Sequence, residues 1–309
     1  MDDRIRGMQN TSFSLLLSYQ KQYPIFVKQA ASYIREYLNS TPEFAIVLGS
    51  GLGEIAQQID IIETIPYKEI PNFPVTSIPS HSGELVIGTL ENRLVIGLKG
   101  RRHFYEGATL PLNIGILQTV FAVHVMAELG IPNYFVTNAA GGLNGKYKVG
   151  DLMLIKSHIN FLPNPLLGAH YPFTRVDDGN HTHRFQPMNE AYNQDFIKKF
   201  LKENKKFSKN IHQGTYLAVT GPTYETEAEC IAFRDGLKAD AVGMSTTPEV
   251  IVARNRGMNV IGLSCITNKI AKDGTNATNH EEVKSILESN DVKERITGSV
   301  VNFFKSLND

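Results

Sequence analysis

Short apolar runs alternate along this chain with stretches that carry the periodicity of a helix. The run Phe44–Leu48 leads into a glycine-rich segment and then a helical pattern, and the apolar run that begins at Val260 ends at Thr267. Strands and helices that follow one another in this way build a sheet covered by helices. The sequence therefore predicts an α/β fold, a single domain over residues 1–309 with a central mixed β-sheet flanked by helices.

The same patterns give approximate positions for the elements. Residues 84–99 alternate around Glu91-Asn92 and predict a β-hairpin. Further strands are expected at 44–48, 134–138, 152–156, 215–220 and 259–266, and helices at 24–38, 111–129, 225–235, 247–256 and 281–305. In this interpretation residues 1–40 are an N-terminal helical segment, and residues 163–187, rich in Pro, His, Asn and Asp, are a long loop.

The amino-acid composition restricts what the protein can bind and in which compartment it can function. The chain has 31 Lys and Arg against 31 Asp and Glu, so no net charge favours nucleic acid or a membrane surface. Its cysteines, Cys230 and Cys265, lie in apolar runs, which indicates buried thiols in a reducing compartment rather than a disulfide or a metal site. We find no basic-then-apolar leader and no run of membrane-spanning length, and we expect a cytoplasmic protein.

A predicted strand at 241–244 turns at Ser245 directly into a helix. Thr246 or Thr247 can cap that helix, Pro248 fits its first turn, and Glu249 complements the positive end of its dipole. The turn also directs backbone N–H groups and the Ser245 hydroxyl at one point, which favours an anion. On its own, the stretch is better explained as an ordinary strand–helix junction.

The glycine-rich segment Gly49-Ser50-Gly51-Leu52-Gly53 follows a predicted strand. Its third glycine comes one residue early for a dinucleotide fingerprint, and the Gly-Lys-Ser/Thr of a nucleoside-triphosphate loop is missing. Glycines still let backbone N–H groups approach a ligand closely, and Ser50 adds a hydroxyl donor. A tight structural turn explains the segment equally well.

A second polar segment lies between Gly100 and Gly107, directly after the hairpin. Arg101 and His103 can both donate to an anion, and Tyr105 offers a flat apolar face with a polar tip. The alternative is a solvated basic turn with a packed aromatic ring. Further polar clusters end the predicted strands at 138–142, 221–225 and 267–269. Because ligands of open α/β sheets gather outside the strand ends, these clusters predict one shared site.

These segments resemble the purine nucleoside phosphorylases of the trimeric class, over residues 44 to 285. The matching motifs occur in the family's order and comprise Gly49-Ser50-Gly51-Leu52-Gly53, Gly100-Arg101, His103-x-Tyr105-Glu106-Gly107, Val136-Thr137-Asn138-Ala139-Ala140-Gly141-Gly142-Leu143-Asn144, Tyr224-Glu225-Thr226-x-Ala228-Glu229-Cys230, Ala239-Asp240-Ala241-Val242-Gly243-Met244-Ser245, Thr267-Asn268-Lys269 and Asn279-His280-Glu281-Glu282-Val283.

The resemblance implies reversible phosphorolysis of purine nucleosides to a free purine and a pentose 1-phosphate. It implies that phosphate is held by Ser50, His81, Arg101, His103, the Ala139 backbone N–H and Ser245. The sugar is expected against Tyr105, Met244 and His280, and the base against Tyr224, Glu225, Asn268, Thr267 and Val242. No metal or organic cofactor is implied, because inorganic phosphate is a co-substrate.

The chemistry of the reaction agrees with these roles, and His103, Asn268 and Glu225 are the expected catalytic residues. Cleavage of the glycosidic bond develops positive charge on the sugar and negative charge on the purine, and a phosphate beneath the sugar stabilises the first. The Asn268 amide can donate to O6 and accept from a protonated N7. The Glu225 carboxylate accepts from the N1–H of a 6-oxopurine but repels the bare N1 of adenine, so inosine and guanosine are the expected substrates.

Several assignments have alternatives. Met244 fits core packing, and His280 can belong to a capping box formed by Thr278 and Glu281. The family completes its pocket with an aromatic residue from a neighbouring subunit, for which Phe173 in the 163–187 loop is the candidate and Tyr171 the next choice. A homotrimer with the site near the subunit interface follows from the resemblance alone.

Three other functions are alternatives. A 5′-methylthioadenosine phosphorylase shares the fold and the phosphate site. It would need an acidic side chain at the position of Asn268, and it would lack a polar histidine at the position of His280. A nucleoside-binding protein without turnover would bind but release no phosphate-dependent product. A dinucleotide-binding module would need a fingerprint that the glycine segment lacks.

Overall fold

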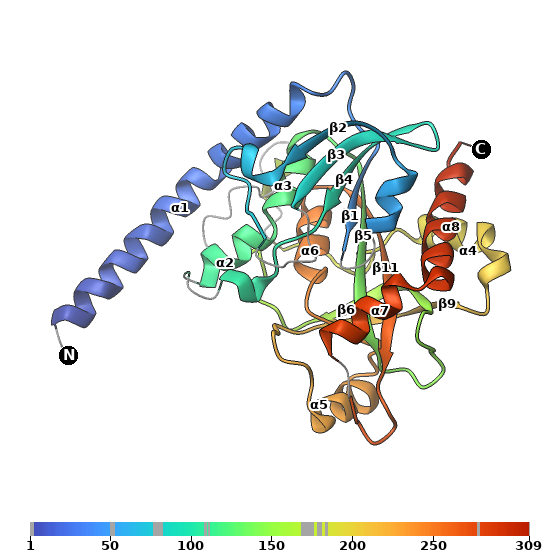
Figure 1. The fold of residues 1–309 in the computed structure, drawn as a ribbon. Coiled ribbons are helices and arrows are strands. Elements are labelled where there is room, and N and C mark those ends of the chain that lie inside the picture. The colour runs from blue at the N-terminus through green and yellow to red at the C-terminus, as the bar shows by residue number, and fades with distance from the viewer. Residues whose placement is uncertain are drawn as a thin grey trace.

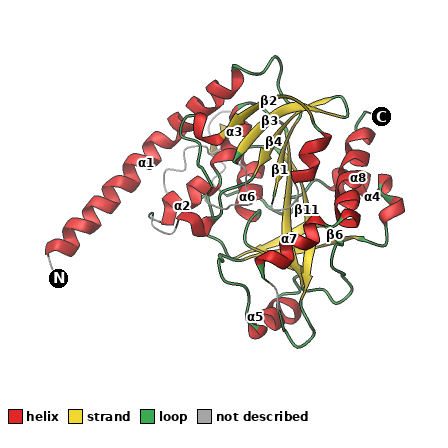
Figure 2. Ribbon diagram, in the orientation of Figure 1, coloured by secondary structure: helices red, strands yellow, loops and turns green. Residues whose placement is uncertain are grey.

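The structure, a computed structural model, describes residues 3–49, 53–76, 83–107, 110, 112–167, 176–177, 181–182, 185–276 and 279–308. Within this part of the chain a twisted sheet crosses the centre of the molecule and helices lie on both sides of it (Figure 1, Figure 2). None of the helices described is long and apolar enough to cross a membrane.

The described part of the central sheet has nine strands in the order β10-β9-β6-β11-β5-β1-β4-β3-β2. They are β1 Phe44–Leu48, β2 Asp60–Pro66, β3 Glu84–Leu90, β4 Arg93–Lys99, β5 Asn133–Gly142, β6 Leu152–Asn160, β9 Ile211–Ala218, β10 Ala241–Gly243 and β11 Asn259–Lys269. Two short strands, β7 Val176–Asp177 and β8 His181–Thr182, pair with each other elsewhere. The sheet contains both parallel and antiparallel pairings, which confirms the predicted mixed α/β fold.

The helices α1, α2, α3 and α6 cover one side of the sheet and α4 and α8 the other (Figure 1). Their bounds are α1 Asp3–Arg35, α2 Leu112–Thr119, α3 Phe121–Glu128, α4 Gln194–Glu203, α5 Glu227–Ile231, α6 Thr247–Asn255, α7 His280–Glu288 and α8 Asn290–Ser306. The long helix α1 extends beyond the body of the molecule at its N-terminal end (Figure 1).

The core lies on both faces of the central strands. β1 is buried along its whole length because it pairs in parallel with β4 on one side and β5 on the other, which is why it appears in the sequence as a continuous apolar run. On the face covered by α8, the Phe44 ring lies 5.0 Å from the Phe304 ring and 6.4 Å from the Phe303 ring, edge to face. These contacts hold the sheet that positions the polar strand ends.

The sheet closes on itself near β10. This short strand pairs in parallel with β9 and antiparallel with β5, so that Val242 lies opposite both Leu217 and Gly141. Strands β5, β11, β6, β9 and β10 therefore form a ring. The closure brings β10 beside the carboxyl ends of β5 and β11.

The predicted hairpin is confirmed: β3 and β4 are joined at Glu91 and Asn92, which have φ values of 50° and 63°. Other boundaries were wrong. The single helix expected at 111–129 is two helices, because Val120 leaves helical geometry at φ −102° and ψ 7°. The helix expected at 281–305 is likewise broken at Ser289, where ψ is 137°.

Two further elements are longer than the sequence pattern predicts, and a third is divided. The strand expected to stop at Asn138 continues to Gly142, because its last residues pair with β11 and β10. The helix expected at 24–38 begins at Asp3 and runs through Pro24. The helix expected at 225–235 is α5 followed by a π-helical turn over Ala232–Gly236.

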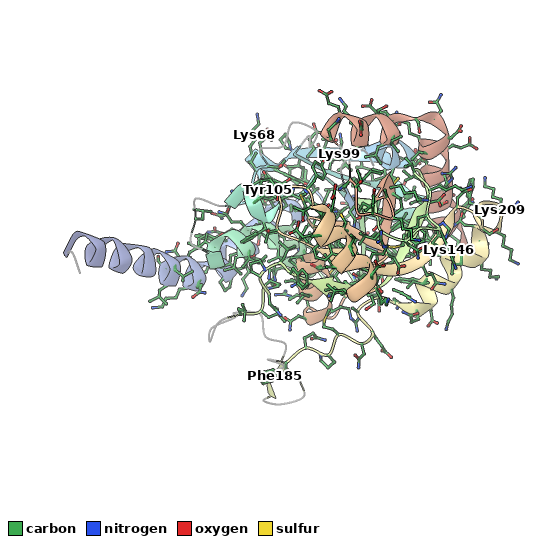
Figure 3. All side chains as sticks on the ribbon, turned by 90° about the horizontal axis from the view of Figure 1, so that it is seen from below. Lys68, Lys99, Tyr105, Lys146, Phe185 and Lys209 are labelled. Atoms are coloured by element: carbon green, nitrogen blue, oxygen red, sulfur yellow. The ribbon has the colours of Figure 1, made fainter. Side chains whose placement is uncertain are left out.

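Much of the loop expected at 163–187 lies outside the described residues. At its end, Phe185 is 86% exposed, on a segment that extends away from the body of the molecule (Figure 3). The thiols behave as predicted, since Cys230 and Cys265 are free and buried. Burial raises the pKa of the Cys265 thiol to about 12, which keeps it protonated and inert.

Candidate active site

A cavity of about 420 Å³ opens where the carboxyl ends of β5, β10 and β11 meet. This volume falls in the range that small-molecule sites occupy. The cavity brings together these residues predicted from the sequence: Arg101, His103, Tyr105, Ala139, Tyr224, Glu225, Val242, Met244, Ser245, Thr267 and Asn268. The prediction that the strand-end clusters share one site agrees with this geometry.

Four predicted site residues are not placed in the cavity. Ser50, His81 and Phe173 lie outside the described residues, and of His280 only the backbone, at the start of α7, is described. The cap of α7 is Asn279, whose side chain accepts from the Glu282 backbone N–H at 2.9 Å. Thr278, on which the capping-box alternative for His280 depends, lies outside the described residues.

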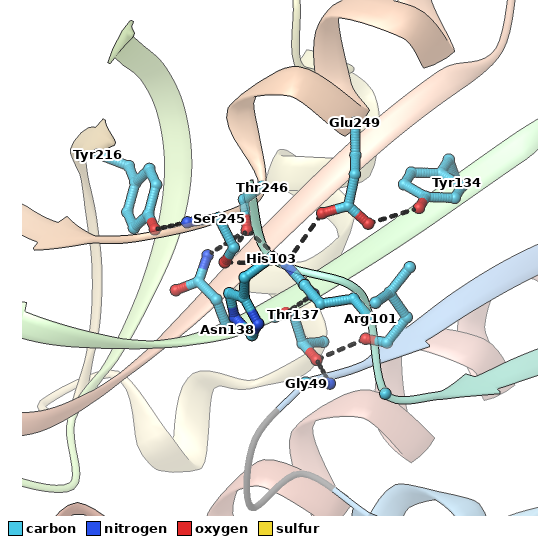
Figure 4. A network of polar contacts seen from close by, with 12 residues as sticks. Gly49, Arg101, His103, Tyr134, Thr137, Asn138, Tyr216, Ser245, Thr246 and Glu249 are labelled. Atoms are coloured by element: carbon cyan, nitrogen blue, oxygen red, sulfur yellow. Dashed lines mark hydrogen bonds and ion pairs between the residues drawn. The ribbon is translucent and has the colours of Figure 1, made fainter. Parts of the chain in front are cut away.

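Arg101 occupies one end of the cavity and is 7% exposed (Figure 4). Its Nη1 donates to the Ser245 hydroxyl at 3.0 Å, the Thr246 hydroxyl at 2.9 Å and the Glu249 carboxylate at 3.0 Å. Its Nη2 donates to the Thr137 carbonyl. The guanidinium is thus fixed by the middle of β5 and by the turn and first residues of α6, which places a cation beside the Ser245 hydroxyl.

Thr246 and Glu249 belong to this network, and the sequence assigned both to the start of a helix only. Thr246 has a φ of 72° and makes no side-chain cap, so the predicted cap is wrong. Its hydroxyl instead accepts from Arg101 and, at 2.8 Å, from the Asn138 amide. Thr247 does not cap the helix either, because its hydroxyl donates to Asn160 at 2.6 Å. The predicted place of Pro248 in the first turn is confirmed.

Glu249 is buried, with 4% of the residue exposed, and holds two partners. One carboxylate oxygen accepts from Arg101 and the other accepts from the Tyr134 hydroxyl at 3.0 Å (Figure 4). Burial, followed by the nearby Glu249 charge, raises the pKa of Tyr134 well above its ordinary value. Tyr134 therefore stays a neutral donor, and Glu249 stays paired with the arginine.

His103 is oriented by its neighbours in the segment after β4. Its ring stacks on that of Tyr105 with centroids 5.0 Å apart and planes 12° apart. The Glu106 carboxylate accepts from the His103 backbone N–H at 2.6 Å, and the same oxygen lies 3.4 Å from the ring Nδ1. The other Glu106 oxygen accepts from Thr76 at 3.2 Å. Glu106, to which the sequence gave no role, thus sets the position of the histidine.

The middle of the cavity is apolar. Tyr105 and Met244 face each other across Gly221, where a Cβ would lie 2.4 Å from the Met244 sulfur and 3.2 Å from the Tyr105 ring. Gly221 also has a φ of 63°, which favours glycine. Burial raises the pKa of Tyr105 to about 12, so its phenol is neutral at neutral pH. The ring and the thioether therefore lie close together on the wall of the cavity.

Glu225 and Asn268 stand at the other end. Asn268 follows a bulge in β11, where the register with β5 shifts between Ile266 and Asn268. Bulges re-aim side chains next to active sites, and here Gly141 opposite leaves the space, since a Cβ there would lie 3.2 Å from the Asn268 Nδ2. Burial raises the pKa of Glu225 above its usual range. Tyr224 beside it is 41% exposed.

The cavity therefore presents cationic and hydroxyl donors at one end and a carboxylate with an amide at the other. Arg101 and Ser245 can hold an anion, and the apolar middle can cover a ring. Glu225 and Asn268 can discriminate between hydrogen-bonding edges. A small anion and a separate ligand with a heteroaromatic ring can therefore occupy the cavity together.

Comparison with known proteins agrees with this geometry. Residues 43–298 match the Phosphorylase superfamily. The chain is 43% identical to purine nucleoside phosphorylase 1 of Bacillus subtilis over 85% of its length and 92% of that protein, and 40% identical to the bovine purine nucleoside phosphorylase over 83% and 86%. A schistosome purine nucleoside phosphorylase solved with hypoxanthine has a TM-score of 0.80 at 36% identity, covering 91% of this chain and 96% of that one.

The chain therefore belongs to the phosphorylase superfamily. Within it, the chain belongs to the purine nucleoside phosphorylases, which are pentosyltransferases.

Proposed function

We propose that this enzyme phosphorolyses 6-oxopurine nucleosides, inosine and guanosine and their deoxy forms, as part of purine salvage in the cytoplasm. The observation that carries the proposal is the pair of Glu225 and Asn268 at the base end of the cavity. A carboxylate accepts the N1–H that a 6-oxopurine presents, and an amide can serve O6 and N7 together.

Phosphate binds at the opposite end in this proposal. Arg101 and His103 supply charge and donors, Ser245 supplies a hydroxyl, and the Ala139 backbone N–H completes the set together with Ser50 and His81. A phosphate held beneath the sugar stabilises the positive charge that develops there and then attacks the same carbon. Because Glu249 and Thr246 fix the guanidinium, Arg101 needs little reorganisation when phosphate arrives.

The leaving base is stabilised at N7 and O6. Negative charge accumulates on the purine as the glycosidic bond breaks, and Asn268 can donate to O6 while accepting from N7–H. The sugar lies between these two ends, against Tyr105 and Met244, with His280 directed at its 5′-hydroxyl. No metal or organic cofactor takes part, and phosphate is the co-substrate.

Adenosine is the informative competitor. A carboxylate facing the bare N1 of adenine repels it, and an unpaired polar contact in a desolvated site can cost several powers of ten. A schistosome purine nucleoside phosphorylase with a TM-score of 0.80 and 35% identity to this chain has been solved with adenosine. Binding is thus not the discriminating measurement, and turnover is.

A 5′-methylthioadenosine phosphorylase is the alternative of the same fold. It would use an acidic side chain where this chain has Asn268, which lines the cavity. We further propose a homotrimer in which Phe173 of the 163–187 loop reaches the neighbouring subunit's site.

The test is a parallel phosphorolysis panel. Purified enzyme with inosine and phosphate should release hypoxanthine, and omission of phosphate should nearly abolish product. Guanosine should react as well, while adenosine and 5′-methylthioadenosine should react far more slowly. Adenosine cleavage as fast as inosine cleavage would contradict the base assignment, and binding without product would favour a nucleoside-binding protein.

A further inference from the structure

The loop at 271–276, directly after β11, is held against α5. The Arg234 guanidinium donates to the carbonyls of Ala271 at 3.0 Å and Lys272 at 2.8 Å. Further along, Gly274 has a φ of 92°, and a Cβ there would lie 2.4 Å from the Glu227 carbonyl oxygen. Only glycine allows the loop to lie this close to the first turn of α5.

This placement inserts Asn276 between the two residues assigned to the base. The Asn268 Nδ2 donates to the Asn276 Oδ1 at 2.9 Å, and the Asn276 Nδ2 donates to the Glu225 carboxylate at 3.3 Å. Asn276 is partly buried and is absent from the residues that line the cavity. It therefore touches both base-recognition residues from behind.

The hydrogen bonds among Glu225, Asn276 and Asn268 allow only one assignment of donors and acceptors. An ionised carboxylate only accepts hydrogen bonds, so Asn276 must turn its NH₂ group to Glu225. Its carbonyl oxygen then faces Asn268, which must donate to it from its own NH₂ group. The Asn268 Oδ1 accepts a hydrogen bond from the Thr267 hydroxyl at 3.3 Å. Its remaining acceptor position is available to a ligand in the cavity.

We propose that Asn276 is a positioning residue that determines base specificity, because it holds the Glu225 carboxylate and the Asn268 amide in the orientation that accepts a 6-oxopurine. The inference rests on the proposed roles of Glu225 and Asn268. With Glu225 ionised, the Asn268 oxygen is available to accept from N7–H as the base leaves. A protonated Glu225 would instead donate to Asn276 or to the N1 of adenine. The donor and acceptor roles of Asn276 and Asn268 would then change.

The charge balance at Glu225 supports this role. Burial raises the pKa of Glu225, whereas the hydrogen bond from Asn276 lowers it. Removing Asn276 should therefore raise that pKa further. Since the carboxylate is the form that accepts N1–H, the loss of inosine turnover on acidification should then begin at a higher pH.

The test compares Asn276→Ala with Lys272→Ala, a change of an exposed side chain on the same loop. We expect Asn276→Ala to lower kcat/KM for inosine roughly tenfold, as loss of a hydrogen bond to a charged group does. The ratio of inosine to adenosine turnover should fall, the acid limb of the inosine profile should move to higher pH, and KM for phosphate should stay unchanged. Lys272→Ala should match the parent enzyme in all four.

A second variant keeps the inference testable if the loop is disturbed. Asn276→Asp retains an acceptor for Asn268 but places a second carboxylate beside Glu225, so the acid limb should move to still higher pH. An unchanged substrate ratio and acid limb in both variants, with the parent enzyme active on inosine, would overturn the inference and leave the proposed function intact. A parent enzyme that does not cleave inosine would overturn the proposed function itself.

Discussion

The guanidinium of Arg101 and the carboxylate of Glu249 form an ion pair of 3.0 Å at one end of the cavity, and each side chain is only 5% exposed. In the sequence these residues belong to separate motifs, and Glu249 had no role beyond its helix. In the structure the carboxylate joins α6 to the segment after β4 and, through Tyr134, to β5. The same ion pair therefore both orients Arg101 in the cavity and holds three parts of the fold together.

Glu249→Ala should destabilise the protein strongly, because it leaves the Arg101 charge buried beside a vacated site. Breaking a buried ion pair by removing one partner costs ~3–5 kcal/mol. Glu249→Gln retains a neutral acceptor and should cost less. Urea unfolding measures both, with Glu294→Ala, a change of an exposed carboxylate on α8, as the control. Equal stability of Glu249→Ala and the control would show that the pair contributes nothing.

Asn268→Asp should shift substrate preference towards 6-aminopurines. A carboxylate at this position accepts from a 6-amino group but repels O6, so inosine turnover should fall while adenosine turnover gains relative to it. The change is measured as the ratio of the two kcat/KM values. If the ratio does not move, another residue recognises position 6 of the purine.

Gly221→Ala should impair nucleoside binding while leaving phosphate binding intact. The new methyl group would meet the Met244 sulfur at 2.4 Å, and the φ of 63° adds backbone strain. Met244 must then move, and both it and Tyr105 line the cavity. We expect KM for inosine to rise about tenfold, which corresponds to a loss of about 1.4 kcal/mol in binding free energy. KM for phosphate should stay within twofold of the parent value. Gly145→Ala, where a Cβ meets no atom within 4 Å, is the matched control.

Stability should fall as the pH drops from 6.5 towards 4, in part through His158. Burial lowers the pKa of this histidine to about 4, whereas the unfolded chain titrates near its ordinary value of 6.5. The unfolded state therefore binds more protons in this window, and stability is lost on acidification by up to ~3 kcal/mol for this group. His158→Gln removes the titration, so its urea midpoint should depend less on pH than that of the parent. Parallel pH dependences would assign the effect to other groups, such as the buried His124.

Much of the site could be predicted from the sequence because its residues are contiguous with strand ends. Arg101, Ser245 and Asn268 each follow an apolar run, and strand ends of one sheet meet in space. The motifs resembling a known family then assigned the roles. Boundaries were less predictable: β5 extends to Gly142 only because β10 and β11 are there to pair with it.

The sequence by itself determined the mixed α/β fold, the hairpin at 84–99 and the identity of the strand-end clusters, because local periodicity and turn residues encode them. Only the tertiary structure decided which residues lie behind those clusters. Glu249 meets Arg101 across 148 positions of the chain, and Asn276 meets Glu225 across 51. Such contacts depend on sheet closure and on how closely a loop can pack at Gly274, and no local pattern records either.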